Sequence, residues 1–216
     1  MLKHERAAMV HFRSAIPAVT LATLALLLNG CEGGILTIQD EGSSVLVTET
    51  RDVGAFTSVE VSGALNLELT VDPTASPAVA VTFDDNLIDR VVTRVSGDTL
   101  VLELDGTFNL IGSGDRLITV TMNALQSLES SGATDVEMSG TASSYRLEVS
   151  GASDVDAVDL TATDVDVDIS GASGVKLSAS GVVGGSVSGA SNLRVHGDPT
   201  SVLVDSSGAS NVDIED

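Results

Sequence analysis

A Ser-Gly-Ala repeat with a period near 19 residues limits what this chain can fold into more than any other feature. The copies begin at Ser131, Ser150, Ser170, Ser188 and Ser207, at spacings of 19, 20, 18 and 19 residues. Each copy continues with alternating apolar and polar residues, which is the pattern of a short strand. A unit of this size cannot bury an apolar face alone, so neighbouring copies are expected to stack. The repeat therefore predicts the coils of a β-solenoid.

Stacked coils bring equivalent residues into line, about 4.8 Å apart. We predict an inward aliphatic column and a glycine column at a bend, where a left-handed backbone or a close approach favours glycine. The aliphatic column consists of Val136, Val155, Val175, Leu193 and Val212, and the glycine column of Gly132, Gly151, Gly171, Gly189 and Gly208.

The first half of the chain also alternates with period two, over residues 65–71, 79–83, 100–104 and 118–122. An early Ser-Gly-Ala begins at Ser62, which lies 69 residues before Ser131 and so not at a multiple of 19. We therefore expect longer loops or a different register there. The pattern predicts one all-β domain over residues 45–216, with the regular repeats in residues 131–216.

The N-terminal segment has the composition of an export signal. Lys3, Arg6 and Arg13 provide positive charge around its start, and an apolar run extends from Ala15 to Leu28. This run is shorter than the roughly 20 residues that a transmembrane helix needs. It has the length of a signal-peptide core. The start at Met1 or at Met9 leaves this interpretation unchanged.

The single cysteine of the chain, Cys31, follows the apolar run directly after Gly30. This arrangement resembles the lipobox of bacterial lipoproteins, and the resemblance implies a signal peptide over residues 1–30, lipidation of Cys31 and a short tether over residues 31–44. An ordinary secretory signal with a chance cysteine is the alternative. Glu32 stands where an aspartate would favour inner-membrane retention, so we expect a lipid anchor in the outer membrane.

Charge and cysteine content exclude several classes of function. The formal net charge is −21 at pH 7, which argues against nucleic-acid binding because phosphate contacts require lysine and arginine. One cysteine allows neither an intramolecular disulfide nor a cysteine-based zinc site. Aromatic residues make up only 2% of the chain, so the core must be aliphatic. Phe56 and Phe83 alternate with strand residues and are expected in it, whereas Tyr145 is expected at the surface.

No catalytic residue is predicted. His196 is the one histidine beyond the signal segment, and no nucleophile motif accompanies it. The acidic residues mostly alternate with valine, as in the segment 164–169, which places them on the outer face of a strand. A solvated acidic surface is the simplest interpretation, because it keeps a β-rich protein soluble.

Calcium is the one cofactor that the repeat leaves open. Asp135 and Asp154 both stand four residues after the repeat serine, and stacked carboxylates attract a hard cation. Gly174 interrupts this column, which continues with Asn192 and Asn211. The alternative is that the carboxylates are simply hydrated and that the two asparagines form an amide ladder.

Several segments together resemble a known family. Residues 51–64, 84–89 and 97–102, followed by the Ser-Gly-Ala repeats, are similar to the bacterial family of the putative auto-transporter adhesin head GIN domain, whose function is unknown. The resemblance covers residues 45–216. It implies a right-handed, single-stranded parallel β-helix and export to the cell envelope, and it brings no active site.

Three functions follow as hypotheses. The first is a non-enzymatic envelope lipoprotein whose acidic solenoid binds a protein or glycan partner, as an adhesin-like or scaffold module. The second is a periplasmic sensor or envelope-stress partner of a membrane protein. The third is a polysaccharide-active enzyme, which a groove with converging buried acids and an arginine would favour.

Overall fold

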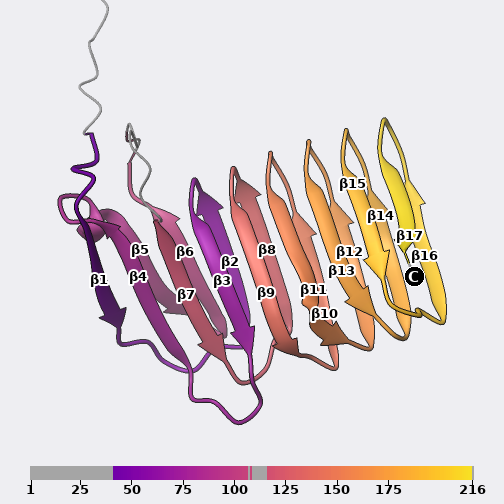
Figure 1. Cartoon of the computed structure of the whole chain (residues 1–216), viewed down its shortest axis with the longest axis horizontal. Coiled ribbons are helices and arrows are strands. Elements are labelled where there is room, and N and C mark those ends of the chain that lie inside the picture. The colour runs from indigo at the N-terminus through magenta and orange to yellow at the C-terminus, as the bar shows by residue number, and fades with distance from the viewer. Residues whose placement is uncertain (1–40, 107, 109–115, 216) are drawn as a thin grey trace, which may run out of the picture. The chain divides into compact units, whose positions relative to one another are not determined.

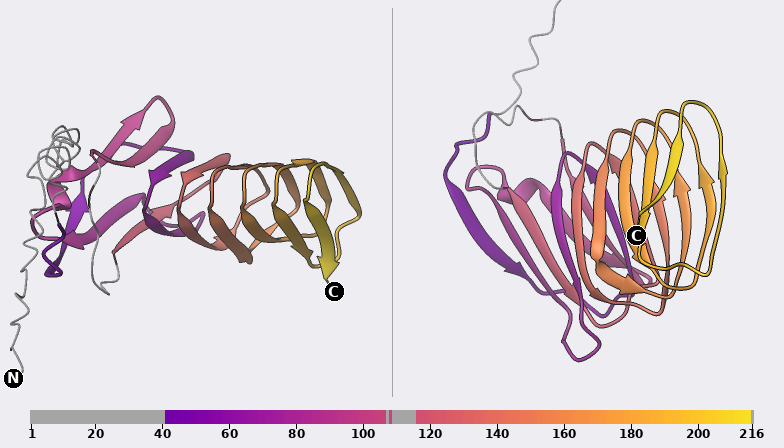
Figure 2. Two further views of the ribbon diagram at one scale, coloured as in Figure 1. Left: turned by 90° about the horizontal axis from the view of Figure 1, so that it is seen from above. Right: turned by 45° about the vertical axis from the view of Figure 1, so that its right-hand side comes forward.

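The computed structural model describes residues 41–106, 108 and 116–215, all within one compact unit, Gln39–Asp216. Cys31 and the predicted signal segment lie outside these residues. The described part is all-β, with one short 3-10 helix, η1 (Ile88–Arg90), and two mixed sheets that face each other (Figures 1 and 2). In the described ranges, no helix is long and apolar enough to cross a bilayer.

The strands divide between the sheets as follows. One sheet contains, in spatial order, β1 (Leu46–Arg51), β4 (Ala78–Asp84), β7 (Leu117–Met122), β3 (Asn66–Val71), β9 (Asp135–Thr141), β11 (Asp154–Ala162), β13 (Gly174–Ala179), β15 (Asn192–His196) and β17 (Asn211–Glu215). The other contains β16 (Ser201–Ser206), β14 (Val182–Val187), β12 (Asp164–Ile169), β10 (Ser144–Val149), β8 (Ser127–Gly132), β2 (Ser58–Gly63), β6 (Thr99–Leu104) and β5 (Val91–Ser96). We call the first the β9 sheet and the second the β8 sheet.

From β8 onward, the chain passes alternately from one sheet to the other. Each strand pairs in parallel with the strand two places later, so every repeat adds one strand to each sheet (Figure 1). The register confirms the predicted aliphatic column. Val155 stands opposite Val136 and Val175, and Leu193 stands opposite Val175 and Val212.

The Ser-Gly-Ala-Ser corner owes its sequence to backbone stacking. The glycines have positive φ, for example +84° at Gly171, which confirms the predicted bend. The N–H of the following alanine donates to the glycine carbonyl one coil earlier, as from Ala172 to Gly151 at 2.8 Å. The last serine folds back, and Ser173 Oγ donates to the Ser170 carbonyl at 3.0 Å. Each of the four positions therefore has a structural role.

The first half departs from the predicted parallel coils. β4 runs antiparallel to both β1 and β7, and β5 runs antiparallel to β6. The physical reason is tight turns that reverse the chain. Gly97, with φ of +64°, connects β5 to β6, and the Asp72 side chain accepts a hydrogen bond from the Thr74 N–H at 2.8 Å in the turn after β3. The prediction of a continuous parallel solenoid over residues 45–216 is therefore wrong for the first half of the chain.

The early copy of the repeat is part of the regular stack. β2 pairs with β8 and β3 pairs with β9, so Gly63 stands opposite Gly132. The intervening chain forms strands β4 to β7 on the other side of β2 and β3. The prediction of a longer connection between the early copy and the regular repeats is therefore confirmed, and the two copies remain in register.

The core lies between the sheets and consists mainly of valine, leucine and isoleucine. Phe56 and Phe83 are buried in it, as predicted. Tyr145 was expected at the surface, but its side chain is only 3% exposed. The reason is the period of β10, in which Tyr145 shares the inward face with Leu147 and Val149. Burial raises the pKa of the Tyr145 phenol.

Candidate functional site

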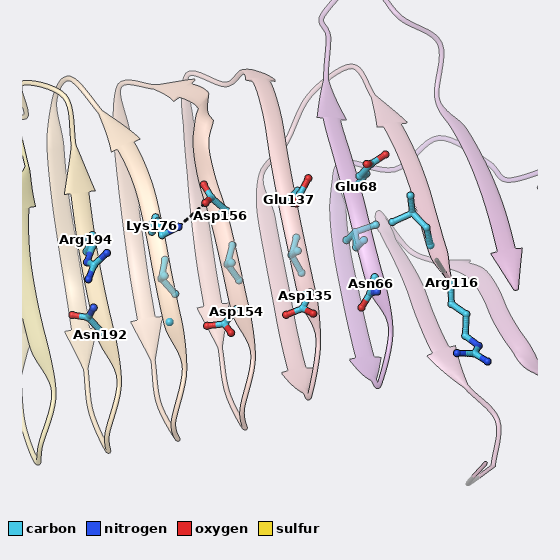
Figure 3. A pocket seen from close by; sticks show the side chains of 16 residues that line it. Asn66, Glu68, Arg116, Asp135, Glu137, Asp154, Asp156, Lys176, Asn192 and Arg194 are labelled. Atoms are coloured by element: carbon cyan, nitrogen blue, oxygen red, sulfur yellow. Dashed lines mark hydrogen bonds and ion pairs between the residues drawn. The ribbon is translucent and has the colours of Figure 1, made fainter. Parts of the chain in front are cut away.

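The outward face of the β9 sheet carries two parallel columns of polar side chains (Figure 3). They arise because in-register strands place equivalent residues side by side. The first, the amide–carboxylate column, consists of Asn66, Asp135, Asp154, Gly174, Asn192 and Asn211. The second, the charged column, consists of Glu68, Glu137, Asp156, Lys176, Arg194 and Asp213. We call the two columns together the polar face.

Two shallow depressions of about 700 Å³ each lie on this face. The first covers the amide–carboxylate column from Asn66 to Asn192, and the second extends toward His196 and Glu215. Both are lined by the charged column from Glu68 to Arg194. A bound molecule in either depression would therefore contact the same charged side chains.

Charge is segregated along the polar face. The strands β3, β9 and β11 carry only acids and Asn66 in these two columns, whereas β13 and β15 supply Lys176 and Arg194 (Figure 3). Lys176 Nζ donates to Asp156 Oδ2 at 2.9 Å, at the boundary between the two halves. Arg194 Nε lies 3.6 Å from Glu215 Oε1. In the described ranges, no cation forms a salt bridge with Glu68, Asp135, Glu137 or Asp154.

The ion pair between Asp156 and Lys176 favours the ionised form of Asp156. Partial burial raises the pKa of Asp156, but hydrogen bonds from Lys176 and from the Val158 N–H outweigh it and lower the pKa overall. Asp156 is therefore a carboxylate at neutral pH. Exposed pairs of this kind contribute little to stability, about 0–1 kcal/mol, so Lys176 is available to other anions at small cost.

The predicted calcium candidates do lie side by side. Asp135 stands directly opposite Asp154, Gly174 follows on the next strand, and both carboxylates are exposed. Calcium takes six to eight oxygen ligands. Within the described residues, no group of three or more His, Cys, Asp or Glu side chains has a metal-binding arrangement. These two carboxylates alone do not supply the necessary ligands, and calcium stays a prediction from the sequence.

The outward face of the β8 sheet carries a column that is acidic on four successive strands. Glu60, Glu129, Glu148 and Asp168 stand in one column on successive strands. Partial burial, together with the charges of Glu60 and Glu148, raises the pKa of Glu129. Arg146 forms ion pairs with Glu148, Asp166 and Asp168, as part of the same face. A face of this charge repels anionic partners.

The structure places the remaining predicted residues as follows. His196 lies on β15, half-buried, with Nε2 at 3.7 Å from Glu215 Oε2. Asp164, Asp166 and Asp168 alternate with buried valines and are exposed, as predicted. The groove on the polar face holds no converging buried acids among the described residues. The fully buried acid Asp84 is paired with Arg116, which lines the first depression (Figure 3).

The charged column was missed in the sequence, although the signal is present. The sixth residue after each repeat serine, starting from Ser62, reads Glu, Glu, Asp, Lys, Arg, Asp. The charge at this position changes from negative to positive between Asp156 and Lys176, and back to negative between Arg194 and Asp213. Reading the repeats position by position, rather than only for their apolar residues, would have found it.

Comparisons with known proteins agree with this fold. A putative adhesin from Bacteroides fragilis NCTC 9343 has a solved structure that aligns with a TM-score of 0.56 at 17% identity, over 81% of this chain and 99% of that chain. A putative adhesin from Parabacteroides distasonis ATCC 8503 aligns with a TM-score of 0.40 at 14% identity, over 82% and 100%. At 17% identity, the likeness to the Bacteroides fragilis structure concerns the fold alone. No curated protein matches the chain.

The family model described as "Putative auto-transporter adhesin, head GIN domain" matches residues 55–138 and 127–199. These two matches overlap at β8 and β9, where the early copy of the repeat meets the regular series. They span well over half of the sequence, from the early copy to the turn before β16. The chain therefore belongs to the putative auto-transporter adhesin, head GIN domain family.

Proposed function

We propose that this protein is a non-enzymatic, lipid-anchored module of the cell envelope that binds a protein or glycan partner in an adhesin-like manner. The observation that carries the proposal is the charge-segregated polar face on an in-register parallel sheet. Such a sheet holds its outward side chains in fixed columns, so little ordering is needed on binding. We further propose that residues 127–215 form a right-handed parallel β-helix, which supports the face.

Binding accounts for the polar face better than catalysis does. Asp135, Glu137 and Asp154 are exposed to solvent and stand in a row, without a buried partner acid. Glycosidase chemistry needs one acid with a raised pKa facing a second carboxylate across the substrate. The face instead presents a run of carboxylates on β3, β9 and β11, followed by the cations Lys176 and Arg194, which suits electrostatic selection of a partner.

The partner is expected to present complementary charges. Its cationic groups would lie over Glu68, Glu137 and Asp135, and its anionic groups over Lys176 and Arg194. Amide groups of Asn66 and Asn192 add hydrogen-bond donors and acceptors for hydroxyl or peptide groups. Both a peptide surface and a charged glycan meet this description, and the assay below includes both.

An adhesion assay tests the proposal. Cells that lack the protein are expected to adhere less to plates coated with extracellular-matrix protein or charged glycan, and the wild-type chain to restore adhesion. The double variant Lys176→Glu, Arg194→Glu is expected to restore at most about a tenth of it, since charge reversal at a binding face costs 1.4 kcal/mol or more. The number of adherent cells is counted.

Arg90→Glu, Arg94→Glu is the matched control, because both arginines are exposed and form only loose ion pairs away from the polar face. It is expected to restore adhesion fully. An epitope tag after Asp216, labelled on intact cells, checks surface display. Labelling only after permeabilisation would place the protein in the periplasm and favour the role of sensor or stress partner. Equal adhesion with and without the wild-type chain would overturn the adhesin role.

Cys31→Ser is expected to release the protein from membranes into the soluble envelope fraction. The physical reason is the loss of the acyl chains, since stable anchoring takes more than one lipid chain. Fractionation followed by immunoblotting measures the change. Gly33→Ser, in the proposed tether, is the control and should stay membrane-bound. If the Cys31→Ser protein remained with the membrane, the lipobox interpretation would be wrong.

A further inference from the structure

β16 and β17 are the last strands of the two sheets at one end of the stack, and no described strand lies beyond them (Figure 1). Among the described residues, β16 pairs only with β14 and β17 only with β15. Ile214 is 56% exposed, although Val195, opposite it on β15, is fully buried. Val204 and Val212, also at inward positions, are only partly buried. We call β16 and β17 the open end.

The backbone of the open end also has free hydrogen-bonding groups. Asn211 N–H donates to the Ser191 carbonyl at 3.0 Å, and Ser207 N–H to the Val187 carbonyl at 2.9 Å. Because successive residues of a strand face opposite sides, the N–H groups of Val204, Val212 and Ile214 point away from the sheets. Such an edge is a template for another strand.

An outward apolar side chain accompanies this edge. Leu203 on β16 is 67% exposed and is the most exposed of the large apolar side chains described. Val182, 40% exposed, lies on the same outward face of β14, opposite Ser201 and two positions away from the partner of Leu203. Further into the stack, this outward face carries the acidic column that includes Glu129 and Glu148. The last strands therefore carry exposed apolar side chains on their inward and their outward faces.

The charge of the open end indicates which strand fits. Its outward side chains include Asp205, Asp213 and Glu215, and neither strand contains lysine or arginine. Where an acid of this stack lies next to a cation on the adjacent strand, as Asp156 does to Lys176 and Glu215 to Arg194, the two side chains form a salt bridge. A second copy carries the same net charge of −21 and would bring acidic side chains against each other, and like charges directly opposite are destabilising. A strand with outward lysine or arginine suits this edge.

We propose that the open end binds an extended segment of a partner protein in which apolar residues alternate with lysine or arginine. The segment adds a strand to the stack: its backbone pairs with β16 or β17, and its apolar side chains cover Val204, Val212 and Ile214. Its cations lie beside Asp205 and Asp213. This is recognition by strand addition, in which the backbone gives affinity and the side chains give specificity.

A synthetic peptide of alternating lysine and valine serves as the probe. Its binding to the full-length chain is measured by fluorescence anisotropy. Two peptides are compared with it, one with the same residues in separate blocks and one with alternating glutamate and valine. The alternating lysine peptide is expected to bind at least about tenfold more tightly than either. Equal binding of the block peptide would show unspecific attraction to an acidic protein and would overturn the proposal.

Two variants locate the binding site. Val204→Pro, Val212→Pro removes outward N–H groups that no strand of the stack uses, and proline is tolerated on edge strands. It is expected to abolish binding of the lysine peptide, with the unfolding midpoint checked by circular dichroism. Asp205→Lys, Asp213→Lys leaves the backbone unchanged and is expected to shift preference toward the glutamate peptide.

Glu60→Lys, Glu129→Lys is the matched control for the charge change. Both glutamates belong to the same outward column of the β8 sheet as Asp205, but they lie in the middle of the stack and outside the polar face. This control is expected to retain binding and preference. An equal loss in the control would contradict the site. Concentration-dependent dimers that the proline variant abolishes would show that a second copy occupies the end instead.

Discussion

Gly171→Ala is expected to lower the free energy of unfolding by about 2–4 kcal/mol, because alanine is strained at a left-handed backbone and has no space there. The φ of Gly171 is +84°, and a Cβ at this position would lie 2.3 Å from the Gly151 carbonyl oxygen. That oxygen already accepts the Ala172 N–H, and Gly189 stacks on the other side, so neither neighbour has room to move. Urea denaturation measures the change.

Gly184→Ala is the control for this prediction. Gly184 lies on β14, and its Cβ would have the Leu203 carbonyl oxygen at 3.8 Å as its nearest neighbour. Because glycine weakens a strand interior, alanine is expected to be neutral or stabilising by up to about 1 kcal/mol. If the two variants unfolded at the same urea concentration, the stability of the corner would not depend on the glycine column.

Asp84→Ala is expected to lower the free energy of unfolding by about 3–5 kcal/mol, the range found when one partner of a buried ion pair is removed. Asp84 is fully buried at the end of β4 and accepts hydrogen bonds from Arg116 and from the Ser44 N–H, the latter at 2.7 Å. The variant removes the Asp84 carboxylate from the Arg116 guanidinium, whose side chain is only 11% exposed. Thermal and urea unfolding report the loss.

The same pair gives the unfolding free energy a defined pH dependence. Hydrogen bonding by Arg116 outweighs burial and lowers the pKa of Asp84. A carboxyl whose pKa is lower in the folded state stabilises the fold above its unfolded pKa, about 3.9, and loses this contribution as pH falls further. The difference between wild type and Asp84→Asn is therefore largest at neutral pH and shrinks below about pH 4.

The exposed loop residue Asp52 provides the control for the pH experiment. Asp52→Asn is expected to change the free energy of unfolding by less than about 0.5 kcal/mol, like most surface substitutions. A gap between wild type and Asp84→Asn that stayed constant from pH 7 to strong acid would contradict the role of the Asp84 carboxylate.

The repeat predicted the regular half of the fold because stacking is a direct consequence of its period. Val136, Val155, Val175 and Leu193 could be aligned from the sequence, and the register places them opposite one another. The glycine corner followed from the same alignment. The repeat also carried the family resemblance, which the family match confirms.

The direction of β4 and β5 could not be predicted in this way. Period-two alternation has the same form in parallel and antiparallel strands, so residues 79–83 fit either arrangement. What decides the direction is the turn chemistry at Asp72 and Gly97, which lies between the patterned segments. Tyr145 shows a related limit, because the position of a residue within its strand, rather than its chemical type, determined its burial.

The repeat predicts only part of the candidate site. Its alignment places Asp135 next to Asp154, which indicates a carboxylate column, whereas Lys176 and Arg194 carry no local signal of a shared surface. Their meaning appears only once β11, β13 and β15 lie side by side. A surface of this kind depends on neighbours that are about 20 residues apart in the chain, and no local motif marks it.

The corner hydrogen bonds have a consequence for how the gene can change. Every coil from Ser131 onward meets its neighbours through the same glycine carbonyl and alanine N–H, for instance Ala190 to Gly171 at 2.8 Å and Ala209 to Gly189 at 2.7 Å. Duplication or deletion of one whole unit thus joins surfaces that already match. Recombination between copies can therefore alter the length of the stack without a new core having to evolve, and with it the order of charges displayed outside.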